Sequence, residues 1–412
     1  MRDWRLAALR LLRPNNAQLP GILHPPKHNH IHLSSGASPF CANYGVPMAI
    51  GKVRHAIRAL APYRPGKSAA QAEQEHGISD AIKLASNENP FPPLPSIVKA
   101  VEAAAGEANR YADHRATELR RRLSDWVGVD PTQVTVGCGS VGLLQQLCLT
   151  YVDPDDEVVF PWVSFEAYPI YTKMMNGIAV SPPLVNHEFD MDAVTAAVNE
   201  QTKLVMLATP NNPTGTALST GRLKTFLESI PSNVIVLIDE AYREFADPSL
   251  GDPVTDLLPH HRNVVITRTF SKAYGLAGLR VGFAITDPEI ITEVDKILLA
   301  FAVNGAAQAA AIAALDSLDQ IQPRIESLLA ERTRVVEALS DAGHTLPDAQ
   351  ANFVFLPLGD RTEAVCVELE RRGVVTRPFP GIGIRVTIGT PEENDRFIGA
   401  LAEAVADTSD ND

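Results

Sequence analysis

The chain has 412 residues, a hydrophobic content of 45% and a formal net charge of −13 at pH 7. This length suits one large domain and a smaller one, each with its own core. The negative charge argues against nucleic acid or an anionic membrane surface as partner, and no apolar run approaches the roughly 20 residues of a membrane span. The four cysteines include no C-x-x-C pair, which predicts reduced thiols in a cytoplasmic protein and no metal centre.

Residues 1–47 differ in composition from the rest of the chain. They are rich in proline, and residues 1–67 contain ten Lys or Arg but a single acid, Asp3. We expect a disordered leader or an over-long reading frame, with Met48 as the true start. The four histidines of His24–His32 make a metal-binding tract an alternative, and the basic composition makes a transit peptide another.

Residues 48–80 are interpreted as an N-terminal arm, which contains a short helical stretch and the stiff segment Ala61–Gly66. A strand that begins at Ile82 runs into a turn at Asn89-Pro90. The hydrophobic pattern then predicts a strand at Gln133–Val136 between helices at Pro95–Ala108, Glu118–Val127 and Val141–Tyr151.

From residue 157 onward, short β-branched runs alternate with helical stretches such as Asp192–Val198 and Gly221–Ser229. This alternation predicts a mostly parallel sheet covered by helices on both faces, in an α/β domain over residues 81–295. The predicted strands are Glu157–Phe160, Ile178–Ser181, Leu204–Ala208, Val234–Ile238, Val264–Thr267 and Arg280–Ile285.

The last third of the chain has a different pattern, which predicts a smaller α+β domain over residues 296–407. Two long helical patterns cover Ile290–Leu315 and Gln322–Asp341. Two strands and two further helices follow, at Asn352–Phe355, Gly383–Ile388, Thr362–Arg371 and Glu392–Ala406.

Several polar motifs follow the predicted strands and together suit pyridoxal 5′-phosphate (PLP). A phosphate dianion needs backbone N–H groups at a helix N-terminus, and the turn Gly137–Val141 supplies them with the hydroxyl of Ser140. Such turns also serve as plain strand–helix connections. Ser271, Thr269 and Arg280 add two hydroxyls and a fixed positive charge.

The ring of this cofactor needs a carboxylate opposite its nitrogen, donors for its phenolic oxygen and a flat apolar partner. Asp239 ends an apolar strand and is the candidate acid, although most Asp residues in such positions only cap the next helix. Asn212 and Tyr242 are the candidate hydrogen-bond donors to the phenolic oxygen of the ring. Phe165 is the preferred ring partner, ahead of Trp162 and Tyr168.

Lys272 would bind the cofactor aldehyde as a Schiff base and afterwards carry a proton from the substrate Cα. Arg385 lies in the apolar strand Gly383–Ile388, where a bidentate pair with a substrate α-carboxylate would explain it. A structural salt bridge is the alternative for Arg385.

These motifs together resemble the class I/II, fold-type I aminotransferases, and within them the histidinol-phosphate aminotransferase family. The similarity extends from about Ile57 to Ala406. It rests on Leu84–Pro90, Asn211–Gly215, Asp239–Tyr242, Thr269–Arg280, Ala351–Val354 and Arg385–Gly389. The resemblance implies a seven-stranded, mostly parallel sheet in the large domain and PLP as cofactor.

The resemblance also implies roles for individual residues. Lys272, Asp239 and Tyr242 would be catalytic. Tyr111 would reach the cofactor phosphate of the neighbouring subunit, which implies a homodimer with shared active sites. The cofactor-binding set would be Gly139, Ser140, Val141, Phe165, Asn212, Asp239, Tyr242, Thr269, Ser271, Lys272 and Arg280, and the substrate-binding set Arg385, Asn212, Tyr63, Asn87 and Arg377.

The segments Gly137–Gln146, Pro161–Pro169 and Leu356–Gly359 resemble the aromatic branch of this family. The expected reaction therefore moves an amino group between an aromatic amino acid (phenylalanine, tyrosine or tryptophan) and 2-oxoglutarate. The alternative is a histidinol-phosphate aminotransferase, in which Arg377 would bind the substrate phosphate. Arg377 could also pair with the distal carboxylate of glutamate, or merely cap the loop before Pro378. A PLP-binding regulator and a lyase or decarboxylase on the same scaffold are more remote alternatives.

Overall fold

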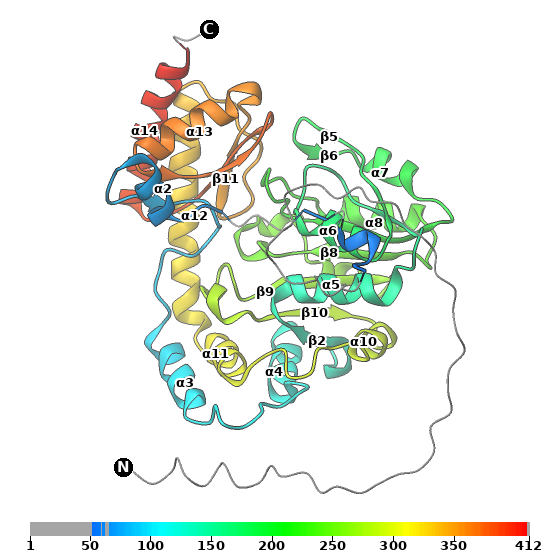
Figure 1. Ribbon diagram of the computed structural model, residues 1–412. Helices are drawn as coiled ribbons and strands as arrows, with labels where there is room; N and C mark the ends of the chain where they lie inside the picture. The colour runs from blue at the N-terminus through cyan, green and yellow to red at the C-terminus, as the bar shows by residue number, and fades with distance from the viewer. Residues whose placement is uncertain (1–51, 59, 62–65, 410–412) are drawn as a thin grey trace, which may run out of the picture. The chain divides into compact units, whose positions relative to one another are not determined.

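A seven-stranded sheet lies at the centre of the fold, in the order β2-β10-β9-β8-β7-β3-β4 (Figure 1). This computed structural model describes residues 52–58, 60–61 and 66–409. Neighbouring strands are parallel except at β10, which is antiparallel to both β9 and β2. The strands are β2 (Val134–Gly137), β3 (Glu157–Val159), β4 (Ile178–Val180), β7 (Thr202–Ala208), β8 (Ile235–Asp239), β9 (Val264–Thr269) and β10 (Gly282–Thr286).

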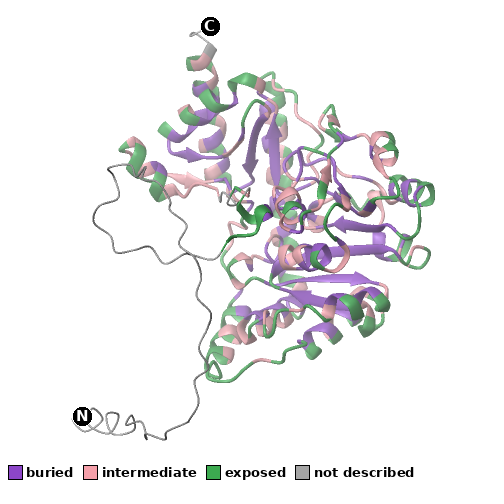
Figure 2. Ribbon diagram, turned by 45° about the vertical axis from the view of Figure 1, so that its right-hand side comes forward, coloured by how far each residue is buried: buried purple, intermediate pink, exposed green. Residues whose placement is uncertain are grey.

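Both faces of this sheet are buried, which explains the continuous apolar runs in its strands. Along β7, Leu204 and Met206 belong to the core on one face, and Val205 and Leu207 belong to the core on the other. Figure 2 shows the strands as buried and the exposed positions mainly on surrounding helices and loops.

Helices on each face complete the two cores. Side chains of α5 (Gly139–Tyr151), α6 (Ala167–Met174) and α10 (Pro288–Asp295) pack on one face. Side chains of α4 (Thr117–Val127) and α8 (Thr220–Ser229) pack on the other. The shorter elements of this part are α3 (Pro95–Ala105), α7 (Met191–Ala197), α9 (Pro253–Asp256), β5 (Leu184–Val185) and β6 (Glu188–Phe189).

The C-terminal part contains a separate three-stranded antiparallel sheet in the order β11-β14-β13. Figure 1 shows the long helix α12 (Leu318–Asp341) running from the region of α11 (Gly305–Leu315) to this sheet. The other elements are β11 (Phe353–Leu356), β13 (Arg377–Phe379), β14 (Gly383–Thr387), α13 (Thr362–Arg371) and α14 (Pro391–Ser409).

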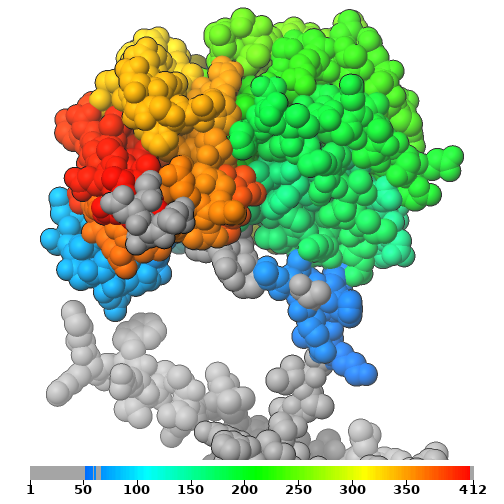
Figure 3. Space-filling model, turned by 90° about the horizontal axis from the view of Figure 1, so that it is seen from above, coloured from blue at the N-terminus to red at the C-terminus, as the bar shows by residue number. Residues whose placement is uncertain are grey.

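The N-terminal arm joins this C-terminal part. Helix α2 (Ala69–His76) packs beside α13, and β1 (Ile82–Lys83) pairs in parallel with β12 (Val374–Val375). Figure 3 shows the light-blue N-terminal segment against the orange and red C-terminal elements. Residues near 85 are thereby held next to residues near 385.

The single helix predicted over Ile290–Leu315 is wrong, because the structure forms two helices there, α10 and α11. The residue Phe301 adopts a left-handed conformation with φ of 58°, and the side chain of Asn304 caps α11 by accepting from the N–H of Ala307. The predicted strand at Arg280–Ile285 also begins later, at Gly282, since Arg280 itself has φ of 58°.

The α/β fold with a mostly parallel seven-stranded sheet is confirmed. Within the described residues, no helix has the length and apolar character needed to cross a bilayer. The leader predicted over residues 1–47, with its histidine tract, and Tyr63 lie outside the described residues.

Candidate active site

The candidate site forms where the carboxyl ends of the parallel strands meet one edge of the sheet. The strand register fixes this alignment: Asp239 is opposite Ala208 and Thr267, and Gly282 is opposite both Gly137 and Thr269. Side chains that directly follow β2, β3, β7, β8 and β9 therefore converge. Ligands in such sheets bind at this edge.

A cavity of about 500 Å³ opens here. It is lined by most of the residues predicted from the sequence, drawn from both the large sheet and the three-stranded sheet. These residues are Asn87, Ser140, Val141, Phe165, Asn212, Asp239, Tyr242, Thr269, Ser271, Lys272, Arg280, Arg377 and Arg385. Their common location makes a single binding site from distant segments, since Ala85 and Arg385 both line it and lie 300 residues apart.

One end of the cavity presents hydroxyls and a positive charge. The hydroxyl of Thr269 donates to Ser271 Oγ at 3.1 Å, and Arg280 Nη1 donates to the same oxygen at 3.3 Å. Ser140 lies in the first turn of α5, where backbone N–H groups have no partner within the helix. This end suits a phosphate dianion.

Two glycines keep that end open. Gly139 has φ of 69°, and a Cβ there would lie 2.6 Å from Arg280 Nη2. A Cβ on Gly282 would lie 2.4 Å from the backbone nitrogen of Ser140. The backbone of the β2–α5 turn can therefore approach the arginine and the neighbouring strand closely only because both side chains are absent.

Lys272 lines the cavity, and its amine donates to the carbonyl oxygen of Ser86 at 3.2 Å. Its burial, reinforced by the guanidinium of Arg385, lowers the pKa of Lys272 to about 7. A substantial fraction of this amine is therefore neutral at physiological pH, which is the form that attacks carbonyl carbon.

Asp239 also lines the cavity, and its carboxylate is buried. Burial raises the pKa of Asp239 to about 6, while hydrogen bonds from Tyr168 and Thr267 act in the other direction. The Tyr168 hydroxyl donates to Oδ2 at 3.0 Å, and the Thr267 hydroxyl donates to Oδ1 at 3.3 Å. The acid is thus oriented through both oxygens and is mainly ionised at neutral pH.

Sequence reasoning considered Tyr168 only as a less favoured ring partner, and the structure gives it a different position. Tyr168 is fully buried under the cavity as the partner of Asp239, whereas Phe165 lines the cavity. Trp162 is partly exposed and is absent from the lining. The periodicity of α6 could have shown that Tyr168 is buried, but not that Asp239 is its partner.

Polar side chains connect the two sheets across the cavity. Arg385 donates to Asn212 Oδ1 at 2.5 Å and to the carbonyl oxygen of Ala85 at 2.6 Å. Asn87 donates to the hydroxyl of Tyr242 at 2.9 Å. Arg385 is therefore held at the cavity wall in a position from which it could bind an anionic group.

One ion pair in the cavity wall was missed by the sequence reasoning. Arg377 Nη2 lies 2.6 Å from Glu166 Oε2, and both residues line the cavity. Glu166 precedes α6 and lies 211 residues before Arg377, so no local pattern could have paired them.

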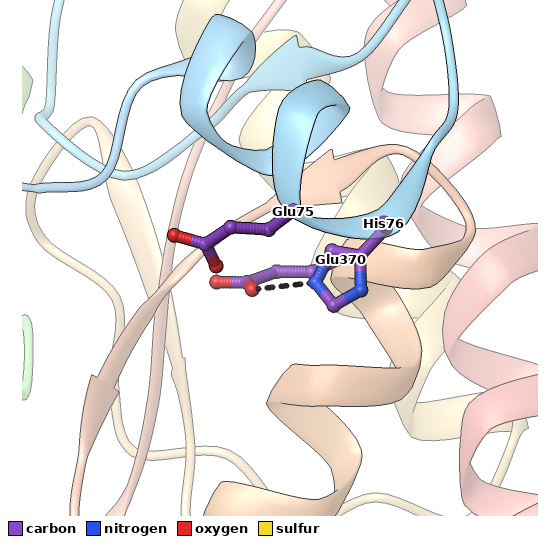
Figure 4. Close-up of side chains that lie close together, drawn as sticks. All are labelled: Glu75, His76 and Glu370. Atoms are coloured by element: carbon purple, nitrogen blue, oxygen red, sulfur yellow. Dashed lines mark hydrogen bonds and ion pairs between the residues drawn. The ribbon is translucent and has the colours of Figure 1, made fainter.

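A second polar cluster lies outside the cavity lining, where Glu75, His76 and Glu370 bring possible ligand atoms within 4.8 Å of one another (Figure 4). The ammonium of Lys67 lies 2.7 Å from Glu75 and 2.6 Å from Glu370. These carboxylates therefore already have a cationic partner, and the cluster links α2 to α13.

Tyr111 is not brought to the cavity of its own chain. Its side chain is 84% exposed and stacks on Phe301, with ring centroids 4.4 Å apart. The predicted contact of Tyr111 with a partner subunit remains a prediction.

Gly139 is adjacent to the lining residues, at the turn described above.

The fold and the site together define an α/β protein whose cavity is lined by a partly buried amine, a buried acid and a cluster of hydroxyls with an arginine. A family profile for aminotransferases of class I and II matches residues 79–401. The chain belongs to this family.

Individual relatives agree with that assignment. An aromatic amino acid aminotransferase of Mycolicibacterium vanbaalenii is 43% identical over 348 residues, covering 84% of this chain and 97% of the relative. One from Mycobacterium tuberculosis is 44% identical over 349 residues, covering 84% of this chain and 96% of the relative. The histidinol-phosphate aminotransferase of Sinorhizobium meliloti, solved with pyridoxal-5′-phosphate, has a TM-score of 0.81 at 30% identity and covers 87% of this chain and 99% of its own.

Proposed function

We propose that the protein is a PLP-dependent transaminase that exchanges the amino group of an aromatic amino acid with 2-oxoglutarate. The observation that carries this proposal is the position of Lys272 and Asp239 in one cavity, with the hydroxyls and arginine of a phosphate cradle beside them. The names of the relatives support the reaction and the aromatic substrate class.

The residues present fit this cofactor. Ser140, Thr269, Ser271 and Arg280 would hold the phosphate, in the cradle that glycine at position 139 keeps open. Asp239 would hold a proton on the ring nitrogen, and Asn212 and Tyr242 would face the phenolic oxygen. When bound, PLP supplies an electron-withdrawing ring that acidifies the substrate Cα–H.

Lys272 has two functions in this scheme. Its neutral amine would hold the cofactor covalently and, once the substrate amine has displaced it, would remove the proton from the substrate Cα. Arg385 would bind the substrate α-carboxylate in a bidentate pair and thereby orient the Cα–H toward this amine.

The wall of the cavity favours an aromatic side chain. Phe165, Ala167, Ile170 and Tyr171 give it a mainly apolar face. A histidinol-phosphate aminotransferase is the second candidate, supported by the Sinorhizobium meliloti structure and by Arg377 in the wall. Glu166 beside Arg377 disfavours that candidate, because a carboxylate repels a phosphate dianion.

The proposal extends to the assembly of the protein. Tyr111, exposed in a single chain, would complete the phosphate site of a partner subunit in a homodimer. We also propose a cytoplasmic location and a division into an N-terminal arm (48–80), a large cofactor-binding domain (81–295) and a small domain (296–407).

The deciding experiment is a comparison of kcat/KM for phenylalanine, tyrosine, tryptophan and histidinol phosphate, each with 2-oxoglutarate. A preference of about 100-fold for an aromatic substrate, about 2.7 kcal/mol in transition-state binding, supports the proposal. The same preference for histidinol phosphate selects the second candidate. Lys272→Ala serves as the inactive control. Absence of turnover with all four substrates would favour a binding protein, and release of CO₂ a decarboxylase.

A further inference from the structure

Two arginines lie directly opposite each other on neighbouring strands of the small sheet. Arg377 of β13 is the register partner of Arg385 of β14, and both line the cavity. Directly opposed side chains of an antiparallel pair lie on the same face, with Cβ atoms about 5 Å apart. Like charges in such a pair repel each other, so the groups around the two guanidiniums determine how much this repulsion costs.

The two arginines have different hydrogen-bond partners. Arg385 donates to two neutral oxygens, those of the Asn212 side chain and the Ala85 carbonyl. Arg377 instead faces the carboxylate of Glu166, at 2.6 Å. One arginine is thus paired with an anion that belongs to the cavity wall itself.

The surroundings of Glu166 allow it to move, whereas Arg377 is fixed in a strand. The side chain of Glu166 is 37% exposed and that of Arg377 is 14% exposed. Glu166 precedes the first turn of α6, and its carboxylate makes no capping bond to that helix. Its rotation toward solvent therefore breaks a single ion pair and leaves the carboxylate hydrated.

A transaminase of the proposed kind must accept two different side chains in the same cavity. One is an uncharged ring, and the other ends in a second carboxylate. A guanidinium that is paired with Glu166 presents little net charge to a ring, whereas an unpaired guanidinium would bind the distal carboxylate of a dicarboxylic acid.

We propose that Glu166 is a specificity-determining residue that acts through Arg377. It neutralises Arg377 while an aromatic side chain occupies the cavity, and it rotates toward solvent when a dicarboxylic acid brings its own anion. Glu166 therefore weakens binding of every ligand with an anionic side chain. This inference rests on the proposed function, because that function requires both ligand classes.

The test uses Glu166→Gln in the PLP-loaded protein and two unreactive acids, glutarate and 3-phenylpropionate, whose dissociation constants are measured by calorimetry. We expect the Kd of glutarate to fall about tenfold, which corresponds to about 1.4 kcal/mol, and the Kd of 3-phenylpropionate not to fall. If Glu166 had a merely structural role, its substitution would weaken the binding of both acids. An unchanged Kd for glutarate, or an equal tightening of both acids, overturns the inference.

Two further variants test whether the change in glutarate binding arises at the Glu166–Arg377 pair. Glu188→Gln makes the same chemical change at an exposed position outside the cavity lining and should leave both constants unchanged. In an Arg377→Gln background, Glu166→Gln should no longer tighten the binding of glutarate, because the guanidinium through which Glu166 acts is absent. Tightening that persists in this background would show that Glu166 does not act through Arg377.

The ratio of kcat/KM for glutamate to kcat/KM for phenylalanine should rise by a similar factor, about tenfold, in Glu166→Gln. This kinetic readout separates the inference from the proposed function. Wild-type protein that catalyses no amino-group exchange contradicts the function, even where glutarate binding responds to Glu166→Gln. Normal exchange with an unaltered ratio contradicts the inference alone.

Discussion

At the scale of single residues, the chemistry of the site depends on how Asp239 is held. Its two carboxylate oxygens accept from Tyr168 and Thr267, and the residue is buried. A hydrogen bond to a carboxylate favours the ionised form, and burial opposes it. The balance places the pKa of Asp239 at about 6. This value is close enough to neutral pH that the loss of one hydrogen-bond donor changes the ionised fraction of the carboxyl group.

Tyr168→Phe removes that donor and leaves the packing of the ring in place. We expect the pKa of Asp239 to rise, because the charged form loses a hydrogen bond worth about 1.5 kcal/mol. The activity should fall about tenfold at neutral pH, and the acidic limb of the kcat/KM profile should move to higher pH. Profiles recorded from pH 5.5 to 9 test this.

Tyr151→Phe, at the end of α5 and outside the cavity lining, is the matched control and should leave the profile in place. An acidic limb that stays fixed in Tyr168→Phe would show that the hydroxyl does not influence the ionisation of Asp239.

The lowered pKa of Lys272 gives a second prediction. In the proposed function the neutral amine is the nucleophile, and its pKa of about 7 makes half of it neutral near that pH in the cofactor-free protein. Labelling of Lys272 by acetic anhydride, followed by mass spectrometry, should therefore rise with pH and reach half of its maximum near pH 7. Lys99, exposed on α3, provides the reference amine in the same sample.

A labelling midpoint for Lys272 near 10.5, the ordinary value for lysine, would contradict the effect of burial and of the neighbouring guanidinium. The cofactor-free protein is needed for this measurement, because the proposed covalent link would consume the amine.

At the scale of secondary-structure elements, the junction between β2 and α5 sets the shape of the proposed phosphate cradle. Gly139→Ala places a Cβ at a left-handed residue and against Arg280 Nη2. The conformation alone costs about 1–2 kcal/mol, and the arginine must also move. We expect PLP affinity to fall at least about tenfold, with a lower melting temperature.

Gly142→Ala, one turn further along α5, is the control for this prediction. A Cβ there would lie 3.4 Å from that of Cys138, close to ordinary contact, and alanine favours the helix. Equilibrium titration of the cofactor-free variants with PLP gives the comparison. Equal affinities for the two variants would argue against a cradle at Gly139.

The elements that sequence alone could predict are those whose pattern is local. Runs such as Leu204–Ala208 identify buried parallel strands because both of their faces are apolar, and the polar residues that follow them converge by topology. The separation of α10 from α11 was missed because the apolar residues 297–303 continue the helical pattern, although Asn304 before Gly305 is a local signal for the start of α11. Phe301, in this connection, is left-handed and stacks on Tyr111.

Pairings between distant segments were beyond sequence reasoning. Tyr168 appeared to be one of three aromatic candidates, and only the packing of α6 on β8 brings its hydroxyl to Asp239. Glu166 lies in the segment Pro161–Pro169, but no local pattern gave it a role, because its partner is Arg377 on the other sheet. Roles that depend on a side chain's own type, such as those of Lys272 and Arg385, were predictable as hypotheses.

At the scale of the whole molecule, the proposed homodimer makes a prediction about complementation. Tyr111→Ala and Lys272→Ala should each be nearly inactive alone. After subunit exchange, one site of each hybrid dimer combines an intact Lys272 with an intact Tyr111 from the other chain. Random mixing would restore about a quarter of all sites.

Subunit exchange is verified by mass spectrometry of the mixed dimers, and activity is measured on the same sample. Mixing either variant with more of itself is the control and should restore nothing. Hybrid dimers that remain inactive would contradict a site shared between subunits.

The joining of β1 to β12, and of Ala85 to Arg385, has a consequence for protein synthesis. The pocket needs residues from Gly66 to Arg385, so a chain on the ribosome carries Lys272 for roughly 6 to 23 seconds before Arg385 is added. During that interval the lysine is present without Arg385, the arginine proposed to bind the substrate carboxylate. Vitamin B6 loading in the cell is therefore expected to complete only after translation has nearly ended.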